Sequence, residues 1–151
     1  GEAQGRSVAP RQSEVVFLLH VGFEVIDLAG PASVFGGARD LEGRSAYDLR
    51  VVSRLGQPVR SGEGLTTSVD GPAHAVTGPV DTFVVPGGLQ VAQAARDAAL
   101  LHEVRRLAAR SRRVVSVCSG ALLLAAAILT DSKPAPQPAP TKAPTAAVAP
   151  R

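Results

Sequence analysis

Short apolar runs alternate along the chain with segments whose apolar residues recur at helical spacing. The runs are rich in Val, Leu and Phe, as in strands buried on both faces of a parallel sheet; they are Glu14–His20, Tyr47–Ser53, Thr82–Val85 and Val114–Val117. Helical spacing is found in Asp27–Leu41, in Asp97–Arg113 and in the Ala/Leu segment that follows Cys118. Strands that alternate with helices predict an open α/β fold, in which a mostly parallel sheet carries helices on both faces.

Capping residues set the expected helix starts. Asp97 is a good N-cap for the second helix. In the first helix, Pro31 fits the first turn, so Asp27 or Gly30 is expected near the cap.

The chain divides into one domain and two ends. Residues 1–13 are polar and predict a flexible arm, whereas the proline- and alanine-rich residues 133–151 predict a disordered tail. The domain is therefore expected to span residues 14–132. Within it, the short extended pieces Val59–Arg60 and Leu65–Val69 indicate a hairpin or excursion.

The composition is that of one globular domain with a small basic excess. The 151 residues are 45% hydrophobic and only 3% aromatic, and the formal net charge is +3. The densest basic cluster comprises Arg105, Arg106, Arg110, Arg112 and Arg113. It fits either a nucleic-acid stripe or the solvated face and last turn of a helix. No aromatic residue is interleaved with these arginines, which favours the helix, so we expect no specific DNA binding by this chain.

The single cysteine excludes an intrachain disulfide and favours a reducing compartment. Residues 1–13 lack the apolar core of a signal peptide, and the apolar run Ala121–Leu129 is too short to cross a bilayer. We therefore expect a cytoplasmic protein without a membrane partner.

The segment VVSVCSGA is the strongest chemical signal. It predicts an elbow at which a buried strand delivers Cys118 to the start of a helix, with the side chain exposed at the carboxyl end of the sheet. The helix N-terminus would lower the pKa of the thiol, and the backbone N–H of Ser119 could bind an oxyanion. The motif is half met, because Ser116 stands where such elbows carry glycine. The alternative is an ordinary buried structural thiol.

Two other segments are expected at the same edge. Pro86-Gly87-Gly88 follows a strand and offers backbone that a ligand can approach closely. Asp27 follows the first strand, either as a helix cap or as the carboxylate that orients the thiol of Cys118. A charged Asp27 would raise the pKa of the thiol, whereas a protonated Asp27 would donate a hydrogen bond to sulfur. On balance, Cys118 is expected to react with iodoacetamide faster than a free thiol near neutral pH.

The histidines His20, His74 and His102 are better explained as structural or solvated than as catalytic. No cysteine and histidine spacing indicates zinc, and no phosphate-binding glycine motif is present. We therefore expect no cofactor and no metal.

Four motifs in order resemble the PfpI/ThiJ superfamily of class I glutamine-amidotransferase-like proteins. They are GFEVIDLAGPASVFGGA, YDLRVVS, DTFVVPGG and VVSVCSGALLLAAA, and the resemblance covers about residues 14–127. It is nearest to the N-terminal sensor domain of GlxA-like regulators of the AraC family. Isonitrile hydratases are similar too, and that resemblance implies Asp27 and Cys118 as the catalytic pair.

The chain departs from these relatives after the cysteine helix. Where they continue into a stretch ending in T-T-H-W, this chain has Ile128–Ser132 and then the Pro/Ala tail, with no helix-turn-helix. The resemblance therefore implies a domain that is incomplete at its C-terminal end and prone to form homo-oligomers. Three functions stay open: a truncated ligand-sensing domain for an unidentified small molecule, a cysteine-dependent enzyme of the isonitrile hydratase type, or a non-functional remnant.

Overall fold

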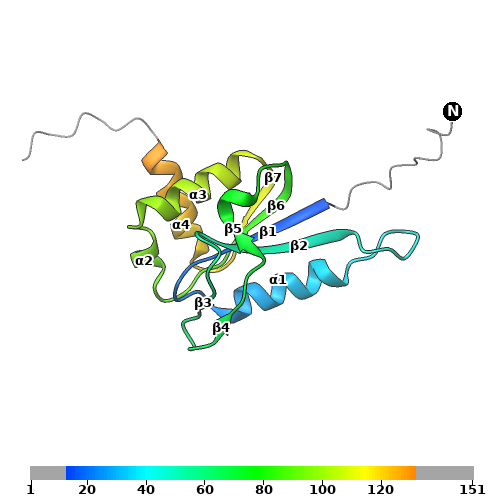
Figure 1. Cartoon of the computed structure of the whole chain (residues 1–151), viewed down its shortest axis with the longest axis horizontal. Coiled ribbons are helices and arrows are strands. Elements are labelled where there is room, and N and C mark those ends of the chain that lie inside the picture. The colour runs from blue at the N-terminus through cyan, green and yellow to red at the C-terminus, as the bar shows by residue number, and fades with distance from the viewer. Residues whose placement is uncertain (1–12, 132–151) are drawn as a thin grey trace, which may run out of the picture.

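A sheet of five parallel strands forms the centre of the protein (Figure 1). The computed structural model describes residues 13–131. The strand order is β5-β2-β1-β6-β7, and every neighbouring pair is parallel. In chain order the strands are β1 (Ser13–Leu19), β2 (Tyr47–Ser53), β5 (Gly71–Pro72), β6 (Val80–Val85) and β7 (Ser111–Ser116).

Helices cover both faces of the sheet, which confirms the predicted open α/β fold (Figure 1). One face packs against α1 (Val25–Gly37); the other packs against α2 (Val91–Ala94), α3 (Ala98–Ala109) and α4 (Gly120–Asp131). Successive side chains of β1 point to opposite faces of the sheet and so pack against different helix layers. Val15 and Phe17 lie in the apolar cluster that includes α1, whereas Val16 and Leu18 lie in the cluster that includes α3 and α4. This double burial explains why β1 reads as a continuous apolar run.

The excursion between β2 and β6 is a hairpin, as predicted. Its strands are β3 (Val59–Arg60) and β4 (Thr66–Thr67), which pair antiparallel. A short 3-10 helix, η2 (Ala73–Ala75), then leads back to the sheet. The two-residue β5 and the four-residue α2 were not predicted, because elements this short carry no periodic pattern.

The prediction for the first helix was wrong at both ends. The N-cap of α1 is Glu24 rather than Asp27 or Gly30, and Pro31 lies inside the helix. The helix ends at Gly37, where Ala38 is already extended, rather than at Leu41. The N-cap prediction for α3 is confirmed, because the side chain of Asp97 accepts hydrogen bonds from the first turn of that helix.

The second predicted helix was too long. It ends at Ala109, and the chain enters β7 at Ser111, so Arg112 and Arg113 are strand residues rather than part of a helix surface. The arginines made this segment look like a helix end in the sequence. In the structure the backbone of β7 pairs with β6, and Arg113 lies opposite Thr82.

Two arginines, one in the last turn of α3 and one at its C-cap, hold the segment that precedes β6. Arg106 donates to the carbonyl oxygens of Ala73 and Val76, and Arg110 donates to that of Thr77. These bonds fix a stretch of chain that has almost no regular structure of its own. These arginines of the basic cluster therefore form more hydrogen bonds within the protein than the expected solvated helix face would form.

The predicted arm and tail fall almost entirely outside the described residues. Ser13, assigned to the arm, instead begins β1. Residues 1–12 and 132–151 lie outside, so a flexible arm and a disordered tail stay predictions. Among residues 13–131, no helix has the length and apolar character needed to cross a membrane.

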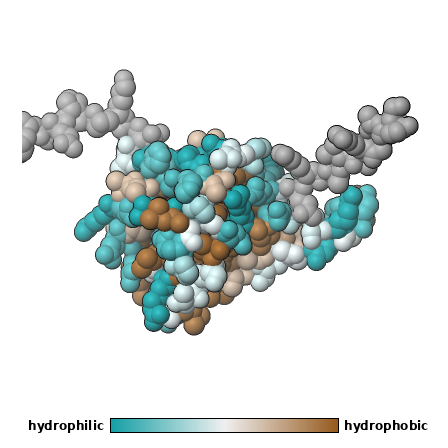
Figure 2. All heavy atoms as spheres, in the orientation of Figure 1, coloured by the Kyte–Doolittle hydropathy of each residue, from teal (hydrophilic) through white to brown (hydrophobic). Residues whose placement is uncertain are grey.

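Apolar side chains remain at the surface of the sheet edge and of α4. Figure 2 shows brown apolar spheres set among teal ones on the face in view. The helix α4 is apolar from Ala121 to Leu129, and its Leu122, Ile128 and Leu129 are 60–71% exposed. Strand β7 is the last of the sheet, and its Val114 and Val115 are partly exposed. Within residues 13–131, nothing covers this apolar face of α4 and no strand pairs with the outer edge of β7. Surfaces of this kind favour association.

We expect the chain to self-associate through α4, and we expect Leu122→Glu combined with Leu129→Glu to weaken this association. The two leucines are seven residues apart and share a helix face, so two carboxylates there disfavour burial against a second copy. Analytical ultracentrifugation over a concentration series measures the effect. Leu41→Glu, at a fully exposed site in the loop after α1, is the control. A wild-type chain that stays monomeric throughout contradicts the expectation.

Asp81 joins β6 to β7 electrostatically. Burial alone would raise the pKa of its carboxyl, but hydrogen bonds from Thr82, Arg112 and Arg113 outweigh burial and lower the pKa. Its oxygens lie 2.8 Å from Arg112 Nε and 3.1 Å from Arg113 Nη2. Both arginines are largely exposed, so solvent screening limits each pair to less than about 1 kcal/mol.

We expect Asp81→Asn to reduce the free energy of unfolding at neutral pH by about 1 kcal/mol. A carboxyl with a lowered pKa in the folded state stabilises above the unfolded pKa, about 4, and this stabilisation is lost as the pH falls through the folded value. The difference between variant and wild type should therefore shrink as the pH falls below about 4, and vanish once the pH lies below the lowered pKa of the folded state. Urea denaturation at several pH values measures it, with the exposed Asp48→Asn as the matched control. A constant difference at all pH values would show that the charge of Asp81 is not the cause.

Candidate functional site

Cys118 occupies a strained turn between β7 and α4. Its φ of 49° makes it the one non-glycine residue with positive φ among residues 13–131. The turn is held on both sides, because Val117 N donates to Val85 O at 3.0 Å and Gly120 N donates to Val117 O at 2.9 Å. Left-handed backbone costs a residue with a side chain roughly 1–2 kcal/mol. The thiol is exposed, as the predicted strand-to-helix elbow requires and unlike a buried structural cysteine.

Two carboxylates from the start of α1 face the thiol. Oxygens of Glu24 and Asp27 and the Sγ of Cys118 all lie within 4.8 Å of one another. Asp27 is only 2% exposed, and its Oδ2 accepts a hydrogen bond from Gly87 N at 3.0 Å. The fold thus brings Asp27 to Cys118, and the helix-cap alternative is wrong because Glu24 is the N-cap.

Glu24 is the member of this group that sequence reasoning missed. Its side chain is exposed, and its only signal is its position three residues before Asp27, one helical turn away. Because the predicted helix began at Asp27, Glu24 was placed in a loop, where its direction could not be inferred.

The carboxylates raise the pKa of the Cys118 thiol. The largest cause is the hydrogen bond with Asp27, followed by the charge of Asp27, burial and the charge of Glu24. A helix N-terminus was expected to lower the pKa of this thiol, but the pKa is raised. The reason is that α4 begins only at Gly120, whereas Asp27 is in direct contact with the thiol. A raised pKa favours the neutral thiol near pH 7, against the predicted rapid reaction with iodoacetamide.

The backbone N–H groups expected to bind an oxyanion or a ligand are those of Gly87, Gly88 and Ser119, and two of them are already bonded within the protein. Gly87 N donates to Asp27, and Gly88 N donates to Ser119 Oγ at 3.0 Å. Within the described part of the chain, the N–H of Ser119 has no such acceptor. Of the three predicted donors, Ser119 is therefore the one that can bind a developing negative charge.

The glycines at this edge are required by close packing. A Cβ on Gly87 would lie 2.5 Å from Ser119 Oγ, and one on Gly88 would lie 2.2 Å from Gly22 O. A Cβ on Gly120 would lie 2.2 Å from Val85 O. These contacts allow the elbow to sit directly against the end of β6.

The group is better suited to thiol chemistry than to metal binding. Glu24, Asp27 and Cys118 could offer three ligand atoms, but no histidine joins them, and Oδ2 of Asp27 is already bonded to Gly87. Structural and catalytic zinc sites draw mainly on cysteine and histidine.

The histidines lie elsewhere. The buried His20 has Nε2 2.9 Å from Pro86 O and Nδ1 3.3 Å from Val21 O, so both ring nitrogens contact backbone carbonyl oxygens. His74 and His102 are exposed, on η2 and α3. The interpretation of His20 as a structural residue fits these contacts.

Comparison with known proteins identifies the fold and several relatives. The chain is 39% identical over 119 residues to an uncharacterized protein of Streptomyces lividans, of which it covers 82%. It is 34% identical over 125 residues to an isonitrile hydratase of Pseudomonas putida, spanning 80% of this chain and 50% of the relative. It is also 45% identical over 56 residues, 37% of this chain, to an HTH-type transcriptional regulator of Mycobacterium tuberculosis, of which it covers 22%.

Among solved structures, a ThiJ/PfpI family protein from Pseudomonas syringae superposes with a TM-score of 0.68 at 29% identity. The match covers 77% of this chain and 46% of that protein, so this chain spans about half the length of its structural relative. The profile of the DJ-1/PfpI family matches residues 13–139. Fold, elbow and similarity agree, and the chain belongs to the DJ-1/PfpI family.

Proposed function

We propose that this chain is a small-molecule-sensing domain of the type found in GlxA-like regulators of the AraC family, with Cys118 and Asp27 at the centre of its site. The observation that carries the proposal is the exposed Cys118 in a left-handed elbow beside the buried Asp27. The pair lies at the carboxyl edge of the sheet, where open α/β folds bind ligands. The similarity to a regulator of the HTH type supports the sensing role.

The chemistry of the site is that of one proton shared by two groups. With the proton on sulfur, Cys118 is a hydrogen-bond donor to Asp27 and a poor nucleophile. Transfer of this proton to Asp27 would leave a thiolate that can add to an electrophilic carbon of a bound molecule. The N–H of Ser119 would then stabilise negative charge that develops on the molecule.

A second candidate function is enzymatic, and the similarity to an isonitrile hydratase favours it. In that case the sulfur of Cys118 adds to the isonitrile carbon, and Asp27 supplies the proton to that carbon. Water then replaces sulfur, so that an isonitrile and one water give an N-substituted formamide, and the thiol is regenerated.

Binding of DNA is not part of the proposal. Arg106 and Arg110 donate to backbone carbonyl oxygens, and Arg112 and Arg113 pair with Asp81. These contacts direct part of each guanidinium toward the protein itself rather than toward a phosphate backbone.

We expect Asp27→Asn to move the pH midpoint of Cys118 alkylation to lower pH. Removing the ionised carboxylate removes the largest cause that raises the pKa of the thiol. The rate of reaction with iodoacetamide, measured by mass spectrometry across a pH series, reports the midpoint directly. Since Cys118 is the only cysteine, no other thiol contributes.

Glu24→Gln is the matched control, because it removes the smaller of the two charge contributions. It should shift the midpoint in the same direction by less. A shift to higher pH in Asp27→Asn would place the proton on Asp27 and reverse the assignment. An alkylation profile that is insensitive to both variants would leave Cys118 as a remnant of the fold without a function.

Turnover of an isonitrile separates the two candidate functions. A sensing domain should bind without turnover, so formamide should not accumulate above the level of a Cys118→Ala variant. Gas chromatography with cyclohexyl isonitrile as the probe measures this difference. Cysteine-dependent formamide formation would reject the sensing role in favour of the enzyme.

A further inference from the structure

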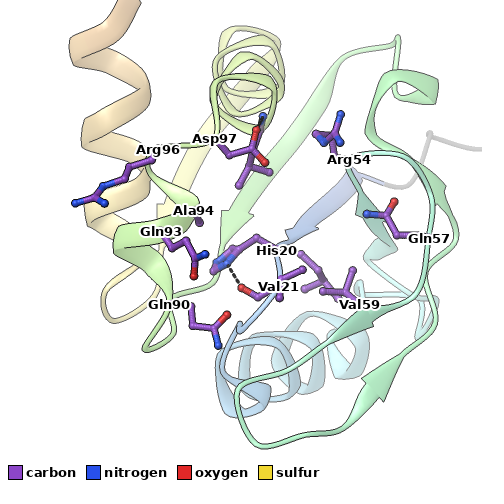
Figure 3. A pocket seen from close by; sticks show the side chains of 12 residues that line it. His20, Val21, Arg54, Gln57, Val59, Gln90, Gln93, Ala94, Arg96 and Asp97 are labelled. Carbon is purple, nitrogen blue, oxygen red and sulfur yellow. Dashed lines mark hydrogen bonds between the residues drawn. The ribbon is translucent and has the colours of Figure 1, made fainter.

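A cavity lies at the carboxyl ends of β1 and β2, on the side of the sheet that carries α2 and α3 (Figure 3). Its volume is about 560 Å³, within the range of small-molecule sites. The walls come from the end of β1, the loop between β2 and β3, and the segment from Gln90 to Leu100. Neither Cys118 nor Asp27 lines it, so the cavity is separate from the site described above.

The floor of the cavity is apolar and firmly held. Leu19, Val59 and Leu100 are at most 4% exposed, and all three line the cavity. The ring of His20 lies beside them and is held by the carbonyl oxygens of Pro86 and Val21. A floor of this kind is formed before a ligand arrives, which reduces the entropy lost on binding.

The rim carries opposite charges on opposite sides (Figure 3). Arg54 is half-buried at the end of β2, and no described residue forms an ion pair or hydrogen bond with its guanidinium. Asp97 faces it from the start of α3. Oδ1 of Asp97 accepts the N–H groups of Ala99 and Leu100, which leaves Oδ2 for another donor.

Side-chain amides also line the cavity, from the segment that contains α2 (Figure 3). Gln93 points toward His20, and Gln90 lies below it in the same view. No described residue forms a hydrogen bond with either amide. Arg96 also borders the cavity but points away from it (Figure 3). The charges directed at the cavity are therefore one cation and one anion.

We infer that this cavity binds a free α-amino acid with an apolar side chain. Arg54 binds the carboxylate as a bidentate partner, because a planar guanidinium matches that geometry. Oδ2 of Asp97 accepts from the ammonium group, and the amide of Gln93 completes the polar contacts. The side chain of the ligand rests on Leu19, Val59 and Leu100. The inference goes beyond the proposed function, since it involves no chemistry at Cys118.

The test is calorimetric titration of the full chain with each proteinogenic L-amino acid, followed by two derivatives of the best binder. We expect at least one apolar amino acid to bind. Its methyl ester, which lacks the carboxylate, and its N-acetyl form, which lacks the ammonium, should each bind about tenfold more weakly or worse, as expected for the loss of a charged hydrogen bond. Failure of every amino acid to bind overturns the inference.

Three variants identify the contacts. Arg54→Gln should weaken binding about tenfold or more, whereas Arg96→Gln, the matched control, should leave it unchanged. Asp97→Asn keeps a good N-cap, so the fold is retained; it should weaken binding of the free amino acid but not of the N-acetyl form. If Arg54→Gln lowers the melting temperature of the unliganded chain, its loss of binding could come from the fold. The result for Asp97→Asn then decides the test. Equal losses of binding affinity in Arg54→Gln and Arg96→Gln contradict the assignment of Arg54 as the partner of the carboxylate.

These experiments can reject the amino-acid site and the proposed function at Cys118 independently of each other. Calorimetry needs no reaction at Cys118, and alkylation of Cys118 needs no amino acid. A chain that binds no amino acid but retains alkylation that depends on Asp27 rejects this inference alone. Binding that persists with an alkylation profile insensitive to Asp27 rejects the proposed function alone.

Discussion

The buried carboxylate of Asp27 is the interaction on which the carboxyl edge of the sheet depends. It accepts from Gly87 N, and Gly87 O in turn accepts from Glu24 N at 2.9 Å, so two hydrogen bonds join the first turn of α1 to the segment after β6. A carboxylate that is 2% exposed is costly unless such donors compensate its desolvation. Because the thiol of Cys118 is part of this compensation, the electrostatics of the site and the stability of the edge cannot be tuned separately.

The sequence was informative where one physical signal dominated. Apolar runs located β1, β2 and β6, and the cysteine after an apolar run located the elbow, because buried parallel strands tolerate little else. It failed at Arg112 and Arg113, exposed edge-strand residues whose charges resemble the end of a helix. The sequence also did not reveal Glu24 as a site residue or the raised pKa of the Cys118 thiol. Both depend on which side chains from distant segments of the chain come into contact. The cavity at Arg54 and Asp97 is likewise a product of tertiary structure alone.

The two sites share one stretch of backbone. His20, at the floor of the cavity, contacts Pro86 O, and the next residue, Gly87, contacts Asp27. A displacement of the His20 ring would therefore act on the carboxylate beside Cys118 through two hydrogen bonds and one peptide. This short connection is the physical route by which occupancy of one site could bias the protonation of the other.

The tight glycines at the elbow bear on how the family can diverge. Gly87, Gly88 and Gly120 have no room for a methyl group, and this constraint would hold whether or not Cys118 reacts. A descendant that lost its chemistry would keep these glycines as long as it kept its fold, whereas Cys118, exposed and in a costly backbone conformation, would be free to drift to glycine. Across homologues, persistence of the cysteine rather than of the glycines is the mark of a selected activity.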